Sequence, residues 1–178
     1  MKFPWHAVVA MALVVTASNF LMNYPINDWL VWGTLSYPLA FLVNDLVNRF
    51  HGAETARRVV YVGFATGVVL SFVLPDVPTR IAFASGTAFL IAQLTDVSVF
   101  NALRARSWWI APSVSSLVSS VVDTALFFSI AFAGSGLPWA TWGTVDLMVK
   151  WMVAAAGIVV YRLLTRRAPP VEAAPATS

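Results

Sequence analysis

Charged and amide side chains stand inside stretches of the chain that are otherwise apolar, and they are its best candidates for chemistry. Gln93 and Asp96 are three residues apart, so on a helix they share one face. Lys150 follows Asp146 by four residues, a favourable spacing for an ion pair on a helix. A carboxylate inside a membrane must be neutralised, paired or hydrated. Asp123 is therefore expected either to pair with Lys150 or to bind substrate or a proton.

Enzymatic chemistry finds little support in the same sequence. The chain has no Cys, which excludes a cysteine nucleophile, a thiolate zinc site and disulfides. Its two histidines, His6 and His51, lie in or near predicted loops, and neither an HExxH nor a P-loop motif is present. Asp96 and Asp123 lie at different predicted depths, which argues against an aspartyl protease. We expect no catalytic residue, no metal and no cofactor; a transporter, a channel or a structural membrane subunit remains.

The composition indicates that a membrane surrounds these residues. Of the 178 residues, 59% are hydrophobic and 11% are charged, whereas a soluble domain has about 25% charged residues. The sequence predicts an all-α polytopic membrane protein with one transmembrane domain over 1–167 and a disordered Pro/Ala-rich tail over 168–178. A spanning helix needs about 20 apolar residues. Six predicted transmembrane helices cover residues 5–24, 29–48, 57–75, 80–101, 108–133 and 139–164.

The basic residues predict the orientation, because cytoplasmic loops are rich in Lys and Arg. With six spans, nearly all basic loop residues fall on one side, and both termini are expected in the cytoplasm. The net charge of +3 is interpreted as this signal and not as nucleic-acid binding. A cleaved signal peptide ending near residues 16–18 is disfavoured, because the apolar run continues to Met22. The cytoplasmic set is Lys2, Arg49, Arg57, Arg58, Arg104, Arg106, Arg162, Arg166 and Arg167.

A rise of about 1.5 Å per helical residue sorts the polar side chains into two layers. The central layer is predicted to contain Asn19, Asp123 and Lys150, together with Asn44 and Gln93. The cytoplasmic layer is predicted to contain Asp45, Asp96, Arg49, Arg57 and Arg58.

Each layer also has a purely structural interpretation. Asp45 and Arg49 are four residues apart and can form a simple ion pair at a helix end. Asp96 can pair with Arg57, Arg58 or Arg104. A stripe of serines over 113–120 serves helix packing more often than ligand binding. The Gly63-xxx-Gly67 spacing indicates close helix packing.

Several motifs of uncommon residues occur in order along nearly the whole chain except the tail. They include ASN in the first span, Pro-x-x-Phe-Leu-x-x-Asp-Leu in the second, and a Gly-Ala-x-x-Ala-Arg-Arg loop. Gln-x-x-Asp-Val-x-Val-Phe-Asn-x-Leu-Arg and Trp-Trp-x-Ala-Pro follow. In these motifs the chain resembles the queuosine precursor transporters of bacterial inner membranes, also called vitamin uptake transporters. It departs from them in a very short LPDVPTR loop, which leaves any role of that loop in substrate capture open.

The resemblance implies a six-helix carrier in the bacterial inner membrane that takes up 7-deazaguanine precursors of queuosine. These are the cyano and aminomethyl forms, preQ0 and preQ1, and some members take queuine itself. Such a cargo is flat and carries donors along one edge, which a carboxylate can accept in a bidentate pair. We therefore expect Asp123 to read the guanine-like edge. Further substrate contacts are expected from Asn44, Gln93, Asn19 and Lys150, with Tyr37, Phe41 and Phe127 as stacking surfaces.

A second hypothesis, based on the cytoplasmic layer, is a gate in which Asp45 and Asp96 pair with Arg49, Arg57 and Arg58. Proton coupling through Asp96 or Asp123 and transport down a gradient are both open. So is a homodimer. A different class is a substrate-binding subunit that docks on a separate ATPase module, as in energy-coupling-factor importers. A membrane scaffold is disfavoured, because it needs few polar stripes. The expected partners are a purine-like small molecule and the lipid bilayer.

Overall fold

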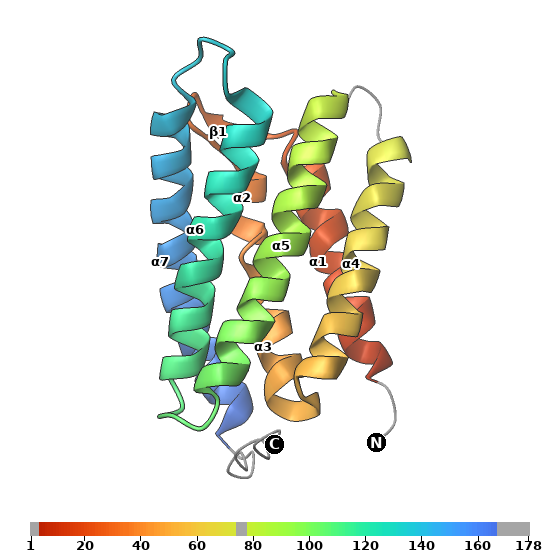
Figure 1. Ribbon diagram of the computed structural model, residues 1–178, viewed down its shortest axis with the longest axis vertical. Helices are drawn as coiled ribbons and strands as arrows, with labels where there is room; N and C mark the ends of the chain where they lie inside the picture. Colours follow the sequence, from red (N-terminus) through yellow and green to blue (C-terminus); the bar gives the residue numbers. More distant parts are fainter. Residues whose placement is uncertain (1–3, 74–77, 167–178) are drawn as a thin grey trace.

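The computed structural model describes residues 4–73 and 78–166, and they form a helical bundle with one small hairpin (Figure 1). The all-α prediction is confirmed. The predicted tail over 168–178 and most of the LPDVP loop lie outside the described residues. The elements are α1 Trp5–Leu21, β1 Pro25–Asn27, β2 Leu30–Val31, α2 Trp32–Ser36, α3 Leu39–His51, α4 Ala53–Val73, α5 Thr79–Leu103, α6 Ile110–Phe132 and α7 Trp139–Thr165.

Length and apolar composition make three helices of the described chain able to cross a membrane. These are α5, α6 and α7, and α1 is a shorter apolar helix. The helices run up and down the long axis of the bundle, so α1 begins and α7 ends at the same end (Figure 1). The α3–α4 and α5–α6 connections lie at that end too, whereas the hairpin and the α6–α7 connection lie at the other.

The second predicted span, 29–48, is not one continuous helix, and this part of the prediction is wrong. Residues up to Val31 belong to the hairpin, and the helix is interrupted between α2 and α3 at Tyr37 and Pro38. Pro38 has no N–H to donate, which removes a bond from the helical ladder. The next backbone N–H groups bond to carbonyls three residues earlier in the chain. Ala40 N–H donates to the Tyr37 carbonyl and Phe41 N–H to the Pro38 carbonyl.

The connection between the first two predicted spans, residues 25–28, belongs to a small β-hairpin. Pro25 pairs with Val31 and Asn27 with Leu30 in antiparallel register. The Asn27 side chain accepts hydrogen bonds from the backbone N–H groups of Trp29 and Leu30 at 2.9 and 3.0 Å. Such an Asx arrangement fixes a short turn locally, without help from a larger sheet.

The close-packing prediction for Gly63 is confirmed. A Cβ atom at this position would lie 2.8 Å from Met11 Cγ of α1 and 3.1 Å from Phe89 Cζ of α5. The missing side chain lets α4 approach both helices, as small residues do in membrane bundles. Met11 is fully buried in the main apolar cluster, which joins α1, α3, α4 and α5.

Arg80, which is not part of the predicted cytoplasmic set, has a structural role. Its guanidinium donates to the backbone carbonyls of Ile130 and Ala133, each at 2.7 Å. These carbonyls belong to the C-terminal end of α6, where helix acceptors lack intrahelical partners. Arg80 therefore ties the start of α5 to the end of α6.

Candidate functional site

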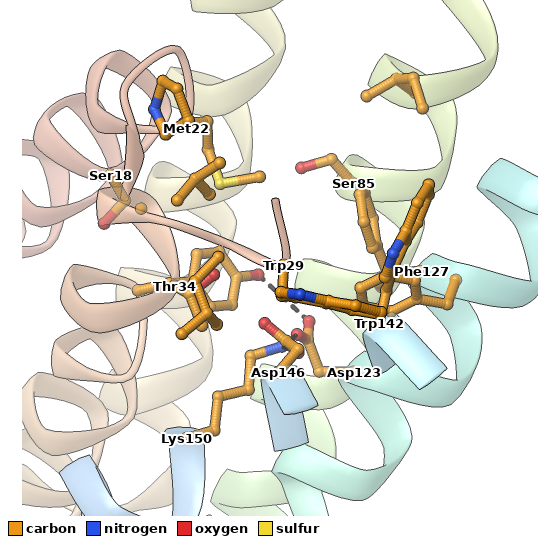
Figure 2. A pocket seen from close by; sticks show the side chains of 18 of the residues that line it. Ser18, Met22, Trp29, Thr34, Ser85, Asp123, Phe127, Trp142, Asp146 and Lys150 are labelled. Carbon is orange, nitrogen blue, oxygen red and sulfur yellow. Dashed lines mark hydrogen bonds and ion pairs between the residues drawn. The ribbon is translucent and has the colours of Figure 1, made fainter. Parts of the chain in front are cut away.

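The hairpin end of the bundle contains a cavity of about 450 Å³ between α1, α2, α5, α6 and α7 (Figure 2). This size lies within the usual range of small-molecule sites. The hairpin contributes to its wall, so the cavity is bounded by both irregular and helical backbone. Its polar lining consists of Ser18, Asn19, Asn27, Asp28, Thr34, Tyr37, Ser85, Asp123, Asp146 and Lys150.

A buried ion network stands at one end of this cavity. Lys150 Nζ lies 2.7 Å from Asp123 Oδ2 and 2.5 Å from Asp146 Oδ2. Figure 2 shows the three side chains converging from α6 and α7. The pairing of Asp123 with Lys150 that the sequence suggested is confirmed. The ammonium is thereby shared between two carboxylates, and the side chains of Lys150 and Asp123 are each only 5% exposed.

Two hydroxyl groups complete the network. Thr124 donates to Asp146 Oδ2 at 2.8 Å and accepts from Lys150 at 3.1 Å. Tyr37, at the interruption between α2 and α3, donates to Asp123 Oδ1 at 3.2 Å. Each oxygen of Asp123 therefore has a partner outside α6. The carboxylate is held in place by charge-assisted bonds, which are the stronger class of hydrogen bond.

The charges of the network do not balance. Two carboxylates, Asp123 and Asp146, face a single ammonium, Lys150, and no other ion pair among the described residues reaches them. A buried charge without a partner is costly. The network is therefore suited to a ligand that brings donor hydrogens, a positive charge or a proton.

Aromatic rings form the wall beside the network. Figure 2 shows Trp29, Phe127 and Trp142 next to Asp123 and Asp146. Phe127 packs edge-to-face on Phe128 and Phe132, with ring centroids 5.1 and 6.1 Å apart. Flat aromatic surfaces beside an acceptor-rich corner are suited to a planar ring with polar edge donors.

The structure brings together five of the residues proposed from the sequence to bind substrate. Asn19, Tyr37, Phe127, Asp123 and Lys150 all line the cavity.

The other three residues proposed to bind substrate, Phe41, Asn44 and Gln93, lie outside the cavity lining. Phe41 is buried and packs edge-to-face on Tyr37, 6.4 Å between ring centroids. Phe41 therefore packs behind Tyr37, on the side away from the cavity. The amide side chains of Asn44 and Gln93 are fully buried.

Asn44 and Gln93 belong to a second polar layer, between the cavity and the end of the bundle where α7 terminates. Asn44 donates to Asp96 Oδ2 and to the Gln93 carbonyl, each at 3.1 Å. Asp45 is 2% exposed and Asp96 is 0% exposed, so both carboxyl groups are buried in this layer. The depth estimate that separated Asn44 from Asp96 is therefore wrong: the four residues form one layer.

Serines of α6, rather than arginines, are the partners of this carboxyl pair. Ser115 and Ser116 donate to Asp45 at 3.0 and 3.3 Å, and Ser119 donates to Asp96 at 3.3 Å. Among the described residues, neither carboxyl group has an ion-pair partner. Ser115, Ser116 and Ser119 thus bind carboxyl groups of α3 and α5. The packing role expected for these serines does not include such bonds.

The arginines of the predicted gate lie elsewhere. Arg58 pairs with Glu54 at 2.8 Å on an exposed face of α4, and Arg57 is exposed as well. Arg49 lines a separate cavity near the end of α7. In the conformation described, these arginines form no ion pair with Asp45 or Asp96. Their pairing in another conformation remains a prediction.

Gln93 stands out within the layer because its side chain is buried without a hydrogen-bond partner at either Oε1 or Nε2 among the described residues. Asn44 Oδ1 and Asn48 Oδ1 are in the same state. Leaving a buried polar group unsatisfied costs about 1–3 kcal/mol. These three side chains therefore keep hydrogen-bonding capacity that no described residue uses.

Several cavity residues were not proposed from the sequence as site residues. The sequence indicates Asp146 only as the ion-pair partner of Lys150, and it does not single out the cavity tryptophans, Trp29 and Trp142. For Asp146 a signal existed, because its spacing from Lys150 placed both near Asp123. For the tryptophans there was none, because position at a span end does not tell lipid from cavity.

Comparisons with known proteins find matches over most of the chain. The family model described as "Putative vitamin uptake transporter" matches residues 31–164. A "Probable queuosine precursor transporter" of Haemophilus influenzae is 34% identical over 187 residues, which cover 83% of this chain and 78% of that protein. The "Queuosine precursor transporter" of Escherichia coli is 33% identical over 193 residues, covering 90% and 87%. No solved structure matches the chain significantly.

Proposed function

Because the chain belongs to the vitamin uptake transporter family, we propose that it is a transporter of queuosine precursors in the bacterial inner membrane. The relatives named queuosine precursor transporters cover most of the chain. The observation that carries the proposal is the cavity in which the unbalanced Asp123–Lys150–Asp146 network faces an aromatic wall. The protein is not an enzyme.

The proposed topology has six spans, with α2 and α3 together forming the second. Both termini are then cytoplasmic. The common location of the start of α1 and the end of α7 supports this, as does the location of the start of α5, which carries Arg80, at the opposite end (Figure 1). The cavity accordingly opens toward the outer side, where an imported molecule would enter. An interrupted helix beside a mid-membrane site is a recurrent feature of transporters.

The proposed cargo is a 7-deazaguanine, in the cyano or the aminomethyl form. Its ring would lie against Phe127 and the cavity tryptophans, and its N1–H and exocyclic amine would be accepted by Asp123. The excess carboxylate of the network would favour these donors, and it would also favour the ammonium of the aminomethyl form. Asn19 and Lys150 can serve the carbonyl edge, because both carry donors.

We assign the second polar layer the role of inner barrier. In the conformation described it separates the outer cavity from the arginine-lined cavity near the end of α7. Gln93 and Asn44 hold unpartnered atoms that a passing cargo can bind. Asp45 and Asp96 would close the layer, with Arg49, Arg57 and Arg58 as counter-charges in another state.

Purified protein in liposomes tests the transport function. We expect the chain alone to accumulate the cyano and aminomethyl deazaguanines inside vesicles, with guanine as a competitor and a protein-free vesicle as control. A protonophore added in parallel reports whether protons drive uptake. A strict requirement for a separate ATPase module would contradict the proposal and favour an energy-coupling-factor subunit.

Replacing Gln93 with leucine tests the inner barrier. We expect the midpoint of thermal unfolding to stay level or rise, because about 1–3 kcal/mol of unsatisfied amide is removed. Uptake should nevertheless fall about tenfold, since the cargo loses a polar contact on its path. Ser98→Ala is the matched control on α5, because its exposed hydroxyl is already bonded to the Leu94 carbonyl. Unchanged uptake by the leucine variant would exclude Gln93 from the path.

Charge exchange tests the pairing of the barrier with arginines. Asp96→Arg and Arg58→Asp are expected to impair uptake singly, and the double variant to recover part of it if the two charges meet during transport. The comparison uses uptake rates at equal amounts of folded protein. A double variant no better than the worse single variant would remove Arg58 from the gate.

A further inference from the structure

A second cavity, of about 270 Å³, lies between the C-terminal ends of α3, α5 and α7 and the α5–α6 connection. This is the end of the bundle where α7 terminates, opposite the hairpin (Figure 1). The cavity is mostly polar, unlike the outer one. Its lining residues are Arg49, Phe100, Arg104, Ala105, Arg106, Ser107, Trp108, Ala111, Tyr161, Arg162, Thr165 and Arg166.

The charge of this cavity is strongly one-sided. Five arginines line it, and no Asp or Glu occurs among the described lining residues. Cytoplasmic loops are expected to be basic, which explains the sign of the charge. It does not explain the convergence, because Arg57 and Arg58 are equally basic and stand exposed on α4, outside this cavity.

Two of the guanidinium groups are held in position by the protein. Arg104 donates to Asn101 Oδ1 and to the Asn48 carbonyl, each at 3.2 Å, while its buried Nε has no partner among the described residues. Arg162 lies over the Trp108 ring, 4.5 Å from the ring centre. Fixed guanidinium forks lose little freedom when they bind an anion.

Crowding of like charges is visible at Arg104. Burial and the neighbouring Arg49 guanidinium lower the pKa of Arg104. A bound anion would relieve both effects, because it neutralises the repulsion and replaces the lost hydration. The hydroxyl groups of Ser107 and Thr165 add polar lining that is compatible with an oxygen-rich ligand.

We propose that this cavity is a binding site for a phosphate-bearing anion. Guanidinium groups match phosphate oxygens in bidentate pairs. A basic cavity between helices at the cytoplasmic face is also a typical site for acidic lipid headgroups. The phosphate can come from an anionic phospholipid of the inner leaflet or from a soluble phosphate. The inference does not depend on which molecule occupies the outer cavity.

Direct binding to the purified, delipidated full-length protein in detergent tests the site. Cardiolipin, phosphatidylglycerol and phosphatidylcholine are titrated in one series, and inorganic phosphate and pyrophosphate in another, with bound ligand counted by native mass spectrometry. We expect the anionic phosphates to bind. Arg106→Gln/Arg166→Gln should weaken binding about tenfold or more, because two charges of the cavity are lost. Arg57→Gln/Arg58→Gln removes the same charge outside the cavity and should change binding less than about twofold.

The two series separate the sources of phosphate. Binding of lipid alone assigns the site to a headgroup, and binding or competition by pyrophosphate assigns it to soluble phosphate. Equal weakening in the two double variants would reduce the effect to net charge and overturn the proposal, as would the failure of every phosphate probe to bind. Should the first double variant misfold, Arg162→Lys keeps the charge and loses the stacked fork. Unchanged binding by that variant would likewise overturn the proposal.

Discussion

Replacing Lys150 with methionine is expected to abolish uptake and to destabilise the protein. Lys150 is the only described cation in contact with Asp123 and Asp146, and its side chain is 5% exposed. Removing one partner of a buried ion pair costs about 3–5 kcal/mol, because a charge is left uncompensated. Here two carboxylates would be left. We expect a clear fall in the thermal unfolding midpoint in detergent, and uptake at the level of empty vesicles.

A second change separates the charge of Lys150 from its shape. Asp146→Asn combined with Lys150→Met restores the formal charge of the network to that of the native protein, so it should recover much of the unfolding midpoint. It should not recover uptake, because the ammonium of Lys150 is still absent and cannot contact the cargo. Arg58→Met is the control for the unfolding midpoint alone, since it breaks an exposed pair with Glu54, and such pairs contribute little to stability. A Lys150→Met protein with native stability would contradict the importance of the network.

Replacing Asp123 with asparagine is expected to reduce uptake about tenfold to a hundredfold while the protein stays folded. The fold should survive because Asn has nearly the same shape and Lys150 retains Asp146 as its partner. Uptake should fall because a neutral amide cannot accept two donors from the cargo edge as a carboxylate does. A hydrogen bond to a charged group is worth about 1.5–3 kcal/mol, which corresponds to the stated loss.

Initial uptake rates of labelled deazaguanine over a range of concentrations measure this effect. We expect the apparent affinity to fall more than the amount of folded protein. Glu54→Gln is the matched control, because it makes the same chemical change on an exposed face of α4 and far from the cavity lining. Near-native affinity and transport by Asp123→Asn would remove Asp123 from substrate recognition.

The sequence alone predicted the helical class, because long apolar runs leave few alternatives in a membrane. It also offered the Asp123–Lys150 pair as one of two alternatives, because a carboxylate inside a membrane must be neutralised, paired or hydrated. It did not predict the interruption at Tyr37 and Pro38. Pro38 stands within a run whose hydrophobicity is uninterrupted, and proline is tolerated inside membrane helices.

The depth of polar residues was harder to predict than their presence. Counting residues along each helix placed Asp96 at the cytoplasmic edge, within reach of arginines. In the structure Asp96 is fully buried and bonded to Asn44 and Ser119. Counting fails here because it ignores tilt and the offset between helices. The bonds from the serines to the two carboxyl groups could not be predicted either. A serine hydroxyl in a helix can bond to its own backbone instead, as Ser120 does to the Ser116 carbonyl.

The interruption between α2 and α3 has a mechanical consequence. Tyr37 stands at the point where the helical ladder is weakest, and its hydroxyl is tethered to Asp123 Oδ1. A cargo that takes this oxygen for its own donors releases the tether. A ligand shifts a conformational equilibrium only through contacts that differ between its states. If the cargo binds Asp123 as proposed, the Tyr37 hydrogen bond would be such a contact, and its loss would couple binding to the position of α2.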